Sequence, residues 1–226
     1  MKDLCVLIPS FNEGRTIGSL VAKLRGRGLT VYVVDDGSID DTAAIAESAG
    51  AVVVRHRTNL GKGASMREGF RHILKKGFEA VVVMDGDGQH VVEDIDNFLM
   101  KMKEADADMV IGNRMGDTSS MPGIRIHTNR FMSGLISRLS GQEIPDSQSG
   151  FRLIKCKLLG RIELKSSNYE IESEMIVKAA RAGYRIASVP ISTVYRDEES
   201  RINPVVDTWR FIIFMARTIF RQIIKG

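Results

Sequence analysis

The segment EAVVVMDGDGQH, residues 79–90, joins a short apolar run directly to a turn that is rich in Asp and Gly. Other short apolar or β-branched runs lie on either side of it in the chain, and helix-like segments separate them. Strands that helices cover on both faces have this nearly continuous apolar character. The predicted strands are Leu4–Pro9, Thr30–Asp35, Ala51–His56, Glu79–Asp85 and Asp108–Gly112. This alternation predicts an α/β fold: a Rossmann-like, mostly parallel sheet with helices on both faces.

Helical periodicity fills the gaps between these strands and returns later in the chain. The first helices are predicted over Arg15–Arg27, Ile39–Ala49, Gly63–Lys76 and Glu93–Glu104. Beyond Gly112 we expect a loop (Arg114–Gly123), helices (His127–Leu139 and Tyr169–Arg181), a strand (Gly150–Ile154) and an extended segment (Tyr184–Tyr195). Without repeats or low-complexity tracts, the chain reads as one domain over residues 1–204. An apolar and basic helix over residues 205–226 follows it.

Composition narrows the class of protein. The chain has 226 residues, of which 43% are hydrophobic, so it can fill a core. A net charge of +4 is too mild for a dedicated nucleic-acid binder. Two cysteines, Cys5 and Cys156, do not make a disulfide scaffold, and the cytoplasm is the expected compartment. We find no secretory signal and no run of about 18 apolar residues, and so expect a soluble or peripheral protein.

Polar turns follow three of the predicted strands. These turns are Pro9–Gly14, Asp35–Ser38 and Asp85–His90. Each one alone would be an ordinary turn, because Asp, Asn and Gly are common there. Parallel strands bring their carboxyl ends to one edge, where α/β proteins bind ligands. Together, the three turns predict a binding site at that edge.

The pair Asp85 and Asp87 is the best candidate for a metal site. Carboxylates two residues apart, with Gly86 between them, can turn toward one hard cation, and Gln89 offers a further oxygen. Mg²⁺ or Mn²⁺ held here would neutralise a diphosphate leaving group. The alternative is structural: the acids would cap the helix that begins near Glu93.

Other motifs are weaker. Asp35 could accept hydrogen bonds from a nucleobase or a ribose, whereas Asp40 or Asp41 is expected to cap the next helix. Asn59–Gly63 lacks the spacing of an ATPase phosphate loop, and residues 86–91 lack that of a dinucleotide fingerprint. The four histidines show no metal spacing.

Basic residues gather in the middle and at the end of the chain. An acceptor that carries phosphate would need arginines, whose fork matches phosphate geometry. The C-terminal segment places Arg210, Arg217, Arg221 and Lys225 in one stripe among aromatic and aliphatic residues. Such a helix can lie in the headgroup region of a membrane. The alternative is a helix docked on the domain's own core or on another subunit.

Taken in order, these motifs resemble the inverting GT-A glycosyltransferases of family two. Within that family the chain looks like the dolichyl- and polyprenyl-phosphate mannosyl- and glucosyltransferases. The resemblance spans nearly the whole chain and includes Asn59–Gly63, Asp146–Arg152, Tyr169–Glu172 and Tyr195–Pro204. One departure is Gly86, where many members carry Ala.

The resemblance implies a role for each matching residue. Pro9, Phe11, Glu13, Val33 and Asp35 would hold the nucleoside, and the backbone of Gly86 would approach the nucleotide. Asp85, Asp87 and Gln89 would hold Mg²⁺ or Mn²⁺. Arg114 and Arg130 would face phosphate groups of donor or acceptor, and Asp146 would act as a base or orient a phosphate. Arg196 and Arg201 would belong to a loop that closes over the donor.

The implied reaction moves mannose or glucose from GDP-mannose or UDP-glucose to a polyprenyl or dolichyl phosphate, with inversion. The protein would work on the cytoplasmic face of the membrane, held there by its C-terminal helix or by a membrane-protein partner. Two alternatives stay open. One is a family-two transferase that acts on a saccharide or another soluble acceptor, and the other is a non-catalytic nucleotide-sugar-binding protein.

Overall fold

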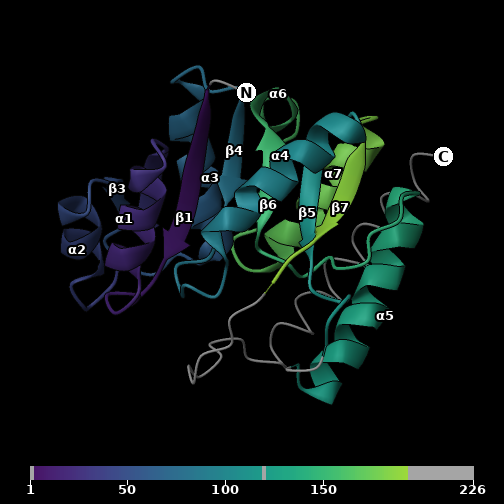
Figure 1. The fold of residues 1–226 in the computed structure, drawn as a ribbon, viewed down its shortest axis with the longest axis horizontal. Helices are drawn as coiled ribbons and strands as arrows, with labels where there is room; N and C mark the ends of the chain where they lie inside the picture. The colour runs from purple at the N-terminus through teal and green to yellow at the C-terminus, as the bar shows by residue number, and fades with distance from the viewer. Residues whose placement is uncertain (1–2, 119–120, 193–226) are drawn as a thin grey trace.

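A seven-stranded sheet forms the centre of the molecule in a computed structural model that describes residues 3–118 and 121–192 (Figure 1). The strand order is β3-β2-β1-β4-β6-β5-β7. The strands are β1 (Leu4–Ser10), β2 (Thr30–Asp35), β3 (Val52–Arg55), β4 (Ala80–Val83), β5 (Met109–Asn113), β6 (Arg152–Lys155) and β7 (Ile186–Pro190). All five strands predicted before Gly112 are therefore confirmed, as is the later one near Ile154.

Helices occupy the segments of the chain between the strands. They are α1 (Ile17–Gly26), α2 (Thr42–Ser48), α3 (Lys62–Leu74), α4 (Ile95–Glu104), α5 (Gly123–Ser140), α6 (Cys156–Leu159) and α7 (Glu170–Arg181). A 3₁₀ turn, η1 (Val92–Asp94), leads into α4. The short α6 was not predicted, because four residues are too few to show a helical period.

The pairing of the strands explains how distant segments meet. β1 lies parallel to β2 and β4, and β5 lies parallel to β7. β6 runs antiparallel between β4 and β5. The sheet is mostly parallel, as predicted, and the reversed strand is an addition. Because β6 is reversed, its first residues lie at the edge where β4 and β5 end.

Two apolar layers cover the sheet. One contains Val6, Ile8 and Val33 from the strands, packed with residues of α1, α2 and α4. The other contains Leu7 and Val34, packed with residues of α3, α5, α6 and α7. Side chains that alternate along each strand therefore enter opposite layers, which is why the strands are apolar throughout. The predicted two-faced covering is confirmed.

Some predictions fall outside the described residues. These are the helix over 205–226, the end of the extended segment at Tyr195, and Arg196 and Arg201. Among the helices that the structure does describe, none has both the length and the apolar content needed to cross a bilayer.

Candidate active site

The three polar turns meet at one edge of the sheet, as their positions predicted. The amide of Asn12 donates to Ser38 Oγ (2.8 Å), which joins the turns after β1 and β2. The hydroxyl of Thr16 donates to the carbonyl of Gly86 (2.6 Å), which joins the first turn to the one after β4. A side chain at Gly86 would place its Cβ 2.8 Å from Ser10 Oγ, so the backbone approaches closely here.

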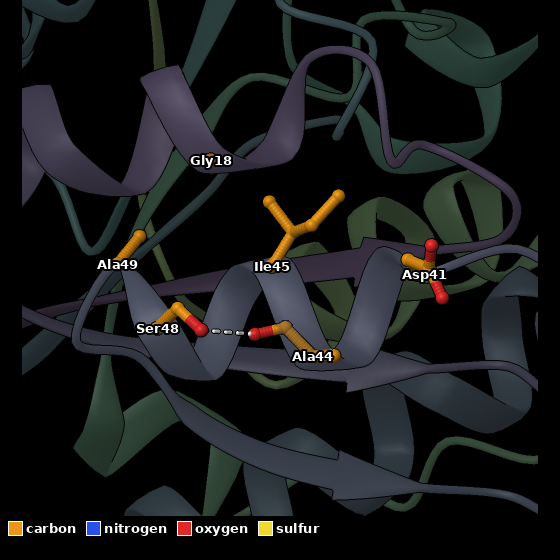
Figure 2. A pocket seen from close by; sticks show the side chains of 6 residues that line it. All are labelled: Gly18, Asp41, Ala44, Ile45, Ser48 and Ala49. Carbon is orange, nitrogen blue, oxygen red and sulfur yellow. Dashed lines mark hydrogen bonds between the residues drawn. The ribbon is translucent and has the colours of Figure 1, made fainter.

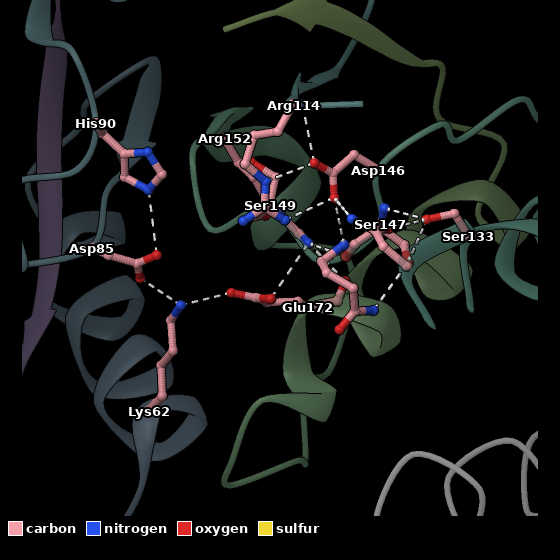
Figure 3. Close-up of polar contacts among 12 residues, drawn as sticks. Lys62, Asp85, His90, Arg114, Ser133, Asp146, Ser147, Ser149, Arg152 and Glu172 are labelled. Atoms are coloured by element: carbon pink, nitrogen blue, oxygen red, sulfur yellow. Dashed lines mark hydrogen bonds and ion pairs between the residues drawn. The ribbon is translucent and has the colours of Figure 1, made fainter. Parts of the chain in front are cut away.

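Asp85 and Asp87 leave the end of β4 without capping a helix. Asp85 Oδ1 lies 2.5 Å from Lys62 Nζ, and its Oδ2 lies 3.3 Å from His90 Nε2 (Figure 3). Asp87 Oδ1 accepts a hydrogen bond from the amide of Gln89 (2.9 Å). The capping alternative is not what the structure shows, because neither η1 nor α4 has a side-chain cap. After β2, the N-cap residue of α2, Asp41, also has no side-chain cap hydrogen bond, and Asp40 Oδ1 instead accepts from the amide of Thr42 (3.1 Å), the first residue of that helix.

The electrostatics of the pair are those of two acids that share one site. Burial and the negative charge of Asp85 raise the pKa of Asp87. Burial also disfavours the charged form of Asp85, but the charge of Lys62 and the hydrogen bond with His90 outweigh it and lower its pKa. Asp85 is thus the firmly ionised member, and a cation nearby would stabilise both.

Lys62 is a site residue that the sequence-based reasoning did not assign. Its Nζ lies between Asp85 and Glu172, 2.7 Å from Glu172 Oε1 (Figure 3). Although burial alone would lower it, these two carboxylates raise the pKa of Lys62, so it stays charged. The signal in the sequence was the pair of glycines that flank the lysine.

The backbone around Lys62 has little freedom. A Cβ at Gly61 would lie 2.3 Å from the carbonyl oxygen of Ser167, and one at Gly63 would lie 2.6 Å from that of Ser166. Gly61 also has φ +96°, a conformation that glycine adopts readily. Asp36 accepts from the amides of Leu60 (2.9 Å) and Gly61 (2.8 Å). The motif is therefore a tightly packed loop that presents its lysine to the acidic pair.

A second cluster surrounds Asp146, which has no exposed side-chain surface. Arg114 donates to it from Nε (2.8 Å), from Nη2 (2.9 Å) and from its backbone amide (3.1 Å). Asn129 on α5 and the amide of Gln148 donate to Asp146 Oδ1. Burial opposes its ionisation, yet Arg114 and Asn129 lower the pKa of Asp146. Both oxygens accept from N–H groups, which favours the phosphate-orienting role over that of a base.

Arg152 holds the two clusters together from a fully buried position. Its guanidinium donates to the carbonyl oxygens of Ser149 (2.9 Å), Glu172 (2.7 Å) and Ser147 (2.9 Å). Arg152 thereby connects the loop after Asp146 to the start of α7. Gly150 lies in that loop, and a Cβ there would lie 2.3 Å from Asp85 Oδ2.

The residues expected at the nucleoside lie on β1, β2 and the turn after β1. Pro9, Val33 and Asp35 are buried, whereas Phe11 and Glu13 are partly exposed. Asp35 Oδ2 lies 3.0 Å from Arg55 Nε, yet no described group donates a hydrogen bond to it. Arg130 lies on the exposed side of α5, next to Asn129, and the structure does not bring it into the Asp146 cluster.

The donors present fit a divalent cation that keeps other ligands. Within residues 3–118 and 121–192, no group of three His, Cys, Asp or Glu side chains forms a complete metal site. Two carboxylates with one amide oxygen suit Mg²⁺ or Mn²⁺, which fill their remaining positions with water and phosphate oxygens. The shared negative charge of Asp85 and Asp87 supplies the attraction.

A hollow between α1 and α2 is lined by other residues: Gly18, Asp41, Ala44, Ile45, Ser48 and Ala49 (Figure 2). Ile45 packs over Gly18 in it, and Ser48 Oγ donates to the carbonyl of Ala44 (2.8 Å). Asp41 is its one charged lining residue. The hollow offers no converging polar groups, so the strand-end cluster is the better candidate site.

Comparison with known proteins tests the family resemblance and the fold. Residues 5–162 match the family described as Glycosyl transferase family 2. The chain is 31% identical over 206 residues to the polyprenol monophosphomannose synthase of Mycolicibacterium smegmatis, covering 85% of this chain and 77% of that one. It is 33% identical over 206 residues to the undecaprenyl-phosphate mannosyltransferase of Micrococcus luteus, covering 84% and 83%.

Solved structures support the fold. Glucosyl-3-phosphoglycerate synthase from Mycobacterium tuberculosis, crystallised with Mn²⁺, uridine diphosphate and glucosyl-3-phosphoglycerate, superposes with a TM-score of 0.72. The match covers 97% of this chain and 79% of that one at 19% sequence identity. At this identity the similarity establishes the GT-A-like architecture.

Proposed function

Because the chain belongs to glycosyl transferase family 2, we propose that it transfers a hexose from a nucleoside-diphosphate sugar to a polyprenyl or dolichyl phosphate. The observation that carries the proposal is the meeting of Asp85 and Asp87 with the Arg114–Asp146 cluster along one sheet edge. An acidic pair suits a metal–diphosphate donor, and a fixed arginine suits an anionic acceptor. The relatives named above act on polyprenyl phosphates, which supports this acceptor class.

The donor's nucleoside would lie over β1 and β2. Asp35 Oδ2, buried and without a hydrogen-bond donor among the described residues, can accept from a base or a ribose hydroxyl. Pro9, Phe11, Glu13 and Val33 would form the surrounding wall. GDP-mannose and UDP-glucose are the candidate donors.

Asp85, Asp87 and Gln89 would hold Mg²⁺ or Mn²⁺ on the diphosphate. When bound, the metal supplies Lewis-acid stabilisation of the departing nucleoside diphosphate. The backbone at Gly86 would approach the nucleotide, and the absence of a side chain there accommodates Ser10 Oγ, which would lie 2.8 Å from a Cβ. Arg196 and Arg201 are proposed to close over the donor, as in the family's pattern.

The acceptor phosphate is already anionic, so its oxygen can attack the anomeric carbon without strong deprotonation. The protein's remaining task is orientation, which brings the two reactants into line. Arg114, held by Asp146, would face a phosphate, and Arg130 would add a second positive charge from α5. A single displacement inverts the anomeric centre and gives a β-linked product from an α-linked donor.

A protein that uses a lipid acceptor has to act at a membrane surface. We propose a catalytic domain over residues 1–204 and a helix over 205–226 that contacts the cytoplasmic face of the membrane. The basic stripe of that helix would face anionic headgroups. A membrane-protein partner could take the same role.

The test is an acceptor comparison. Purified protein with Mn²⁺ and a radiolabelled donor is offered polyprenyl phosphate, a saccharide, or 3-phosphoglycerate, and the label is partitioned between organic and aqueous phases. We expect label in the organic phase only when polyprenyl phosphate is present. Label on an aqueous acceptor would establish the alternative transferase. Donor binding without any turnover would establish a nucleotide-sugar-binding protein.

A further inference from the structure

The loop Asn59–Gly63 has no role in the proposed transfer reaction, yet it places a charged lysine beside the proposed metal site. Lys62 Nζ lies 2.5 Å from Asp85 Oδ1, which is one of the proposed metal-binding carboxylates. It also lies 2.7 Å from Glu172 Oε1, a residue distant in sequence on α7. Figure 3 shows the three side chains in a row, with Lys62 in the middle.

We propose that Lys62 is a positioning residue that competes with the divalent metal for Asp85. The metal then binds tightly only together with the nucleoside diphosphate. The inference rests on the proposed metal site, but it concerns the charges of this chain and not the identity of the sugar acceptor.

The charges argue for competition. Asp85 and Asp87 offer two negative charges. Lys62 places its positive charge directly against one of them, that of Asp85. The side chains of Lys62 and Asp85 are only 15% and 29% exposed, so solvent screens this interaction weakly. A cation at hydrogen-bond distance from a ligand oxygen repels a second cation that approaches the same oxygen. A metal that arrives with a diphosphate brings its own negative charges and is repelled less.

Glu172 explains how Lys62 can give up its contact with Asp85. Its side chain is 5% exposed and lies on the far side of the ammonium group from Asp85. When Asp85 turns to a metal, Glu172 keeps Lys62 paired, so no buried charge is left alone. Arg152 fixes the start of α7 by donating to the carbonyl of Glu172 (2.7 Å). The second carboxylate therefore makes the exchange of partners possible.

The test measures Mn²⁺ binding to the protein alone by electron paramagnetic resonance of the free ion, so it needs neither sugar nor lipid. We expect Lys62→Met to bind Mn²⁺ roughly tenfold more tightly than the natural protein. Glu172→Gln, which leaves Lys62 on Asp85 alone, is expected to bind it more weakly. Addition of GDP or UDP should strengthen Mn²⁺ binding by a larger factor in the natural protein than in Lys62→Met.

Two controls separate this effect from general charge. Lys62→Arg keeps the positive charge and should not show the tighter Mn²⁺ binding expected of Lys62→Met. Lys157→Met removes a lysine that pairs with Asp108 (2.8 Å) at the start of β5, and it should change nothing. Thermal unfolding checks that each variant is folded. If Lys62→Met does not fold, the weaker binding predicted for Glu172→Gln decides.

Equal or weaker Mn²⁺ binding by folded Lys62→Met would overturn the inference, as would tighter binding by Glu172→Gln. Both results are independent of the proposed function. Absence of hexose transfer together with tighter Mn²⁺ binding by Lys62→Met would refute the function and leave the competition standing. Hexose transfer to lipid, together with unchanged Mn²⁺ binding by Lys62→Met, would support the proposed function and refute the competition.

Discussion

Arg114 donates one hydrogen bond to each oxygen of the buried carboxylate of Asp146, from Nε at 2.8 Å and from Nη2 at 2.9 Å. This geometry fixes the plane of the guanidinium group as well as its position. Arg114 follows β5 directly, and Asp146 precedes β6, so the pair joins two strands that are neighbours in the sheet. Its predicted role is to hold a phosphate-binding arginine in place.

Loss of this pair should cost both stability and activity. Asp146→Asn removes the carboxylate charge that faces the guanidinium of Arg114 and turns an amide toward N–H donors. We expect a loss of about 3–5 kcal/mol in the free energy of unfolding, measured by urea denaturation. The control is Asp96→Asn, whose pair with Arg27 is 67% exposed at the aspartate and should contribute under about 1 kcal/mol. Equal losses in the two variants would contradict this role for Asp146.

The same pair predicts a pH dependence of stability. The pKa of Asp146 is lowered in the folded protein, mainly by Arg114 acting against burial. A lowered folded pKa stabilises the protein above the unfolded value of about 3.9. The difference in unfolding free energy between the natural protein and Asp146→Asn should therefore be constant from neutral pH down to about pH 5. It should shrink as the pH falls further, toward the folded pKa. A difference that grows on acidification would contradict the prediction.

Asp87→Asn should abolish transfer while leaving the fold intact. Asp87 is partly exposed and accepts a hydrogen bond only from the amide of Gln89 among its described contacts, so stability depends little on it. We expect turnover to fall by roughly a hundredfold or more at saturating donor. Thermal unfolding should stay close to that of the natural protein. Normal turnover by this variant at low metal concentration would refute the metal assignment.

Gly150 should be essential for the placement of Asp85. A Cβ at residue 150 would lie 2.3 Å from Asp85 Oδ2 and 2.9 Å from its Cγ, so Gly150→Ala must displace the carboxylate. We expect at least a tenfold loss of turnover, by analogy with other displaced catalytic groups. Gly160→Ala is the matched control, because its Cβ would meet nothing closer than 3.7 Å and its φ is −72°. Similar activity in both variants would contradict the argument.

Gly86 and Ser10 should depend on each other. A Cβ at Gly86 would lie 2.8 Å from Ser10 Oγ, a buried hydroxyl without a partner among the described residues. We expect Gly86→Ala to weaken donor binding, measured by calorimetry with GDP and UDP in Mn²⁺. Adding Ser10→Ala should restore it in part, because the nearest obstructing atom is gone while Glu13 Cγ, 3.1 Å from that Cβ, stays in place. A double variant no better than Gly86→Ala would show that the contact does not matter.

The sequence predicted those parts of the fold that depend on local pattern. Apolar runs that lead into polar turns identified β1, β2 and β4 and the edge at which Asp35, Asp85 and Asp87 lie. The reversal of β6 could not be predicted, because a four-residue run carries no direction. The metal ligands and the nucleoside contacts stay predictions that the named variants test.

Lys62 and Glu172 were missed for a related reason. Their ion pair joins α3 to α7, and the two residues are 110 positions apart in the sequence. A comparison of the local segment with an ATPase phosphate loop does not test for such a distant contact. Arg114 and Asp146 were chosen separately, and the structure shows that an ion pair joins them. Arg130 was chosen by the same reasoning, yet it lies on the exposed side of α5, because its helical position turns it away from Asp146 while Asn129 faces it.

Hexose transfer to a lipid phosphate can be detected by mass spectrometry of the organic extract. The full chain, Mn²⁺ and a polyprenyl phosphate are incubated separately with GDP-mannose and with UDP-glucose, beside Asp87→Asn as the inactive control. We expect a hexosyl-phosphoryl-polyprenol from one donor, absent with Asp87→Asn. An extract that holds only unmodified polyprenyl phosphate, while the donor is consumed on an aqueous acceptor, would contradict it.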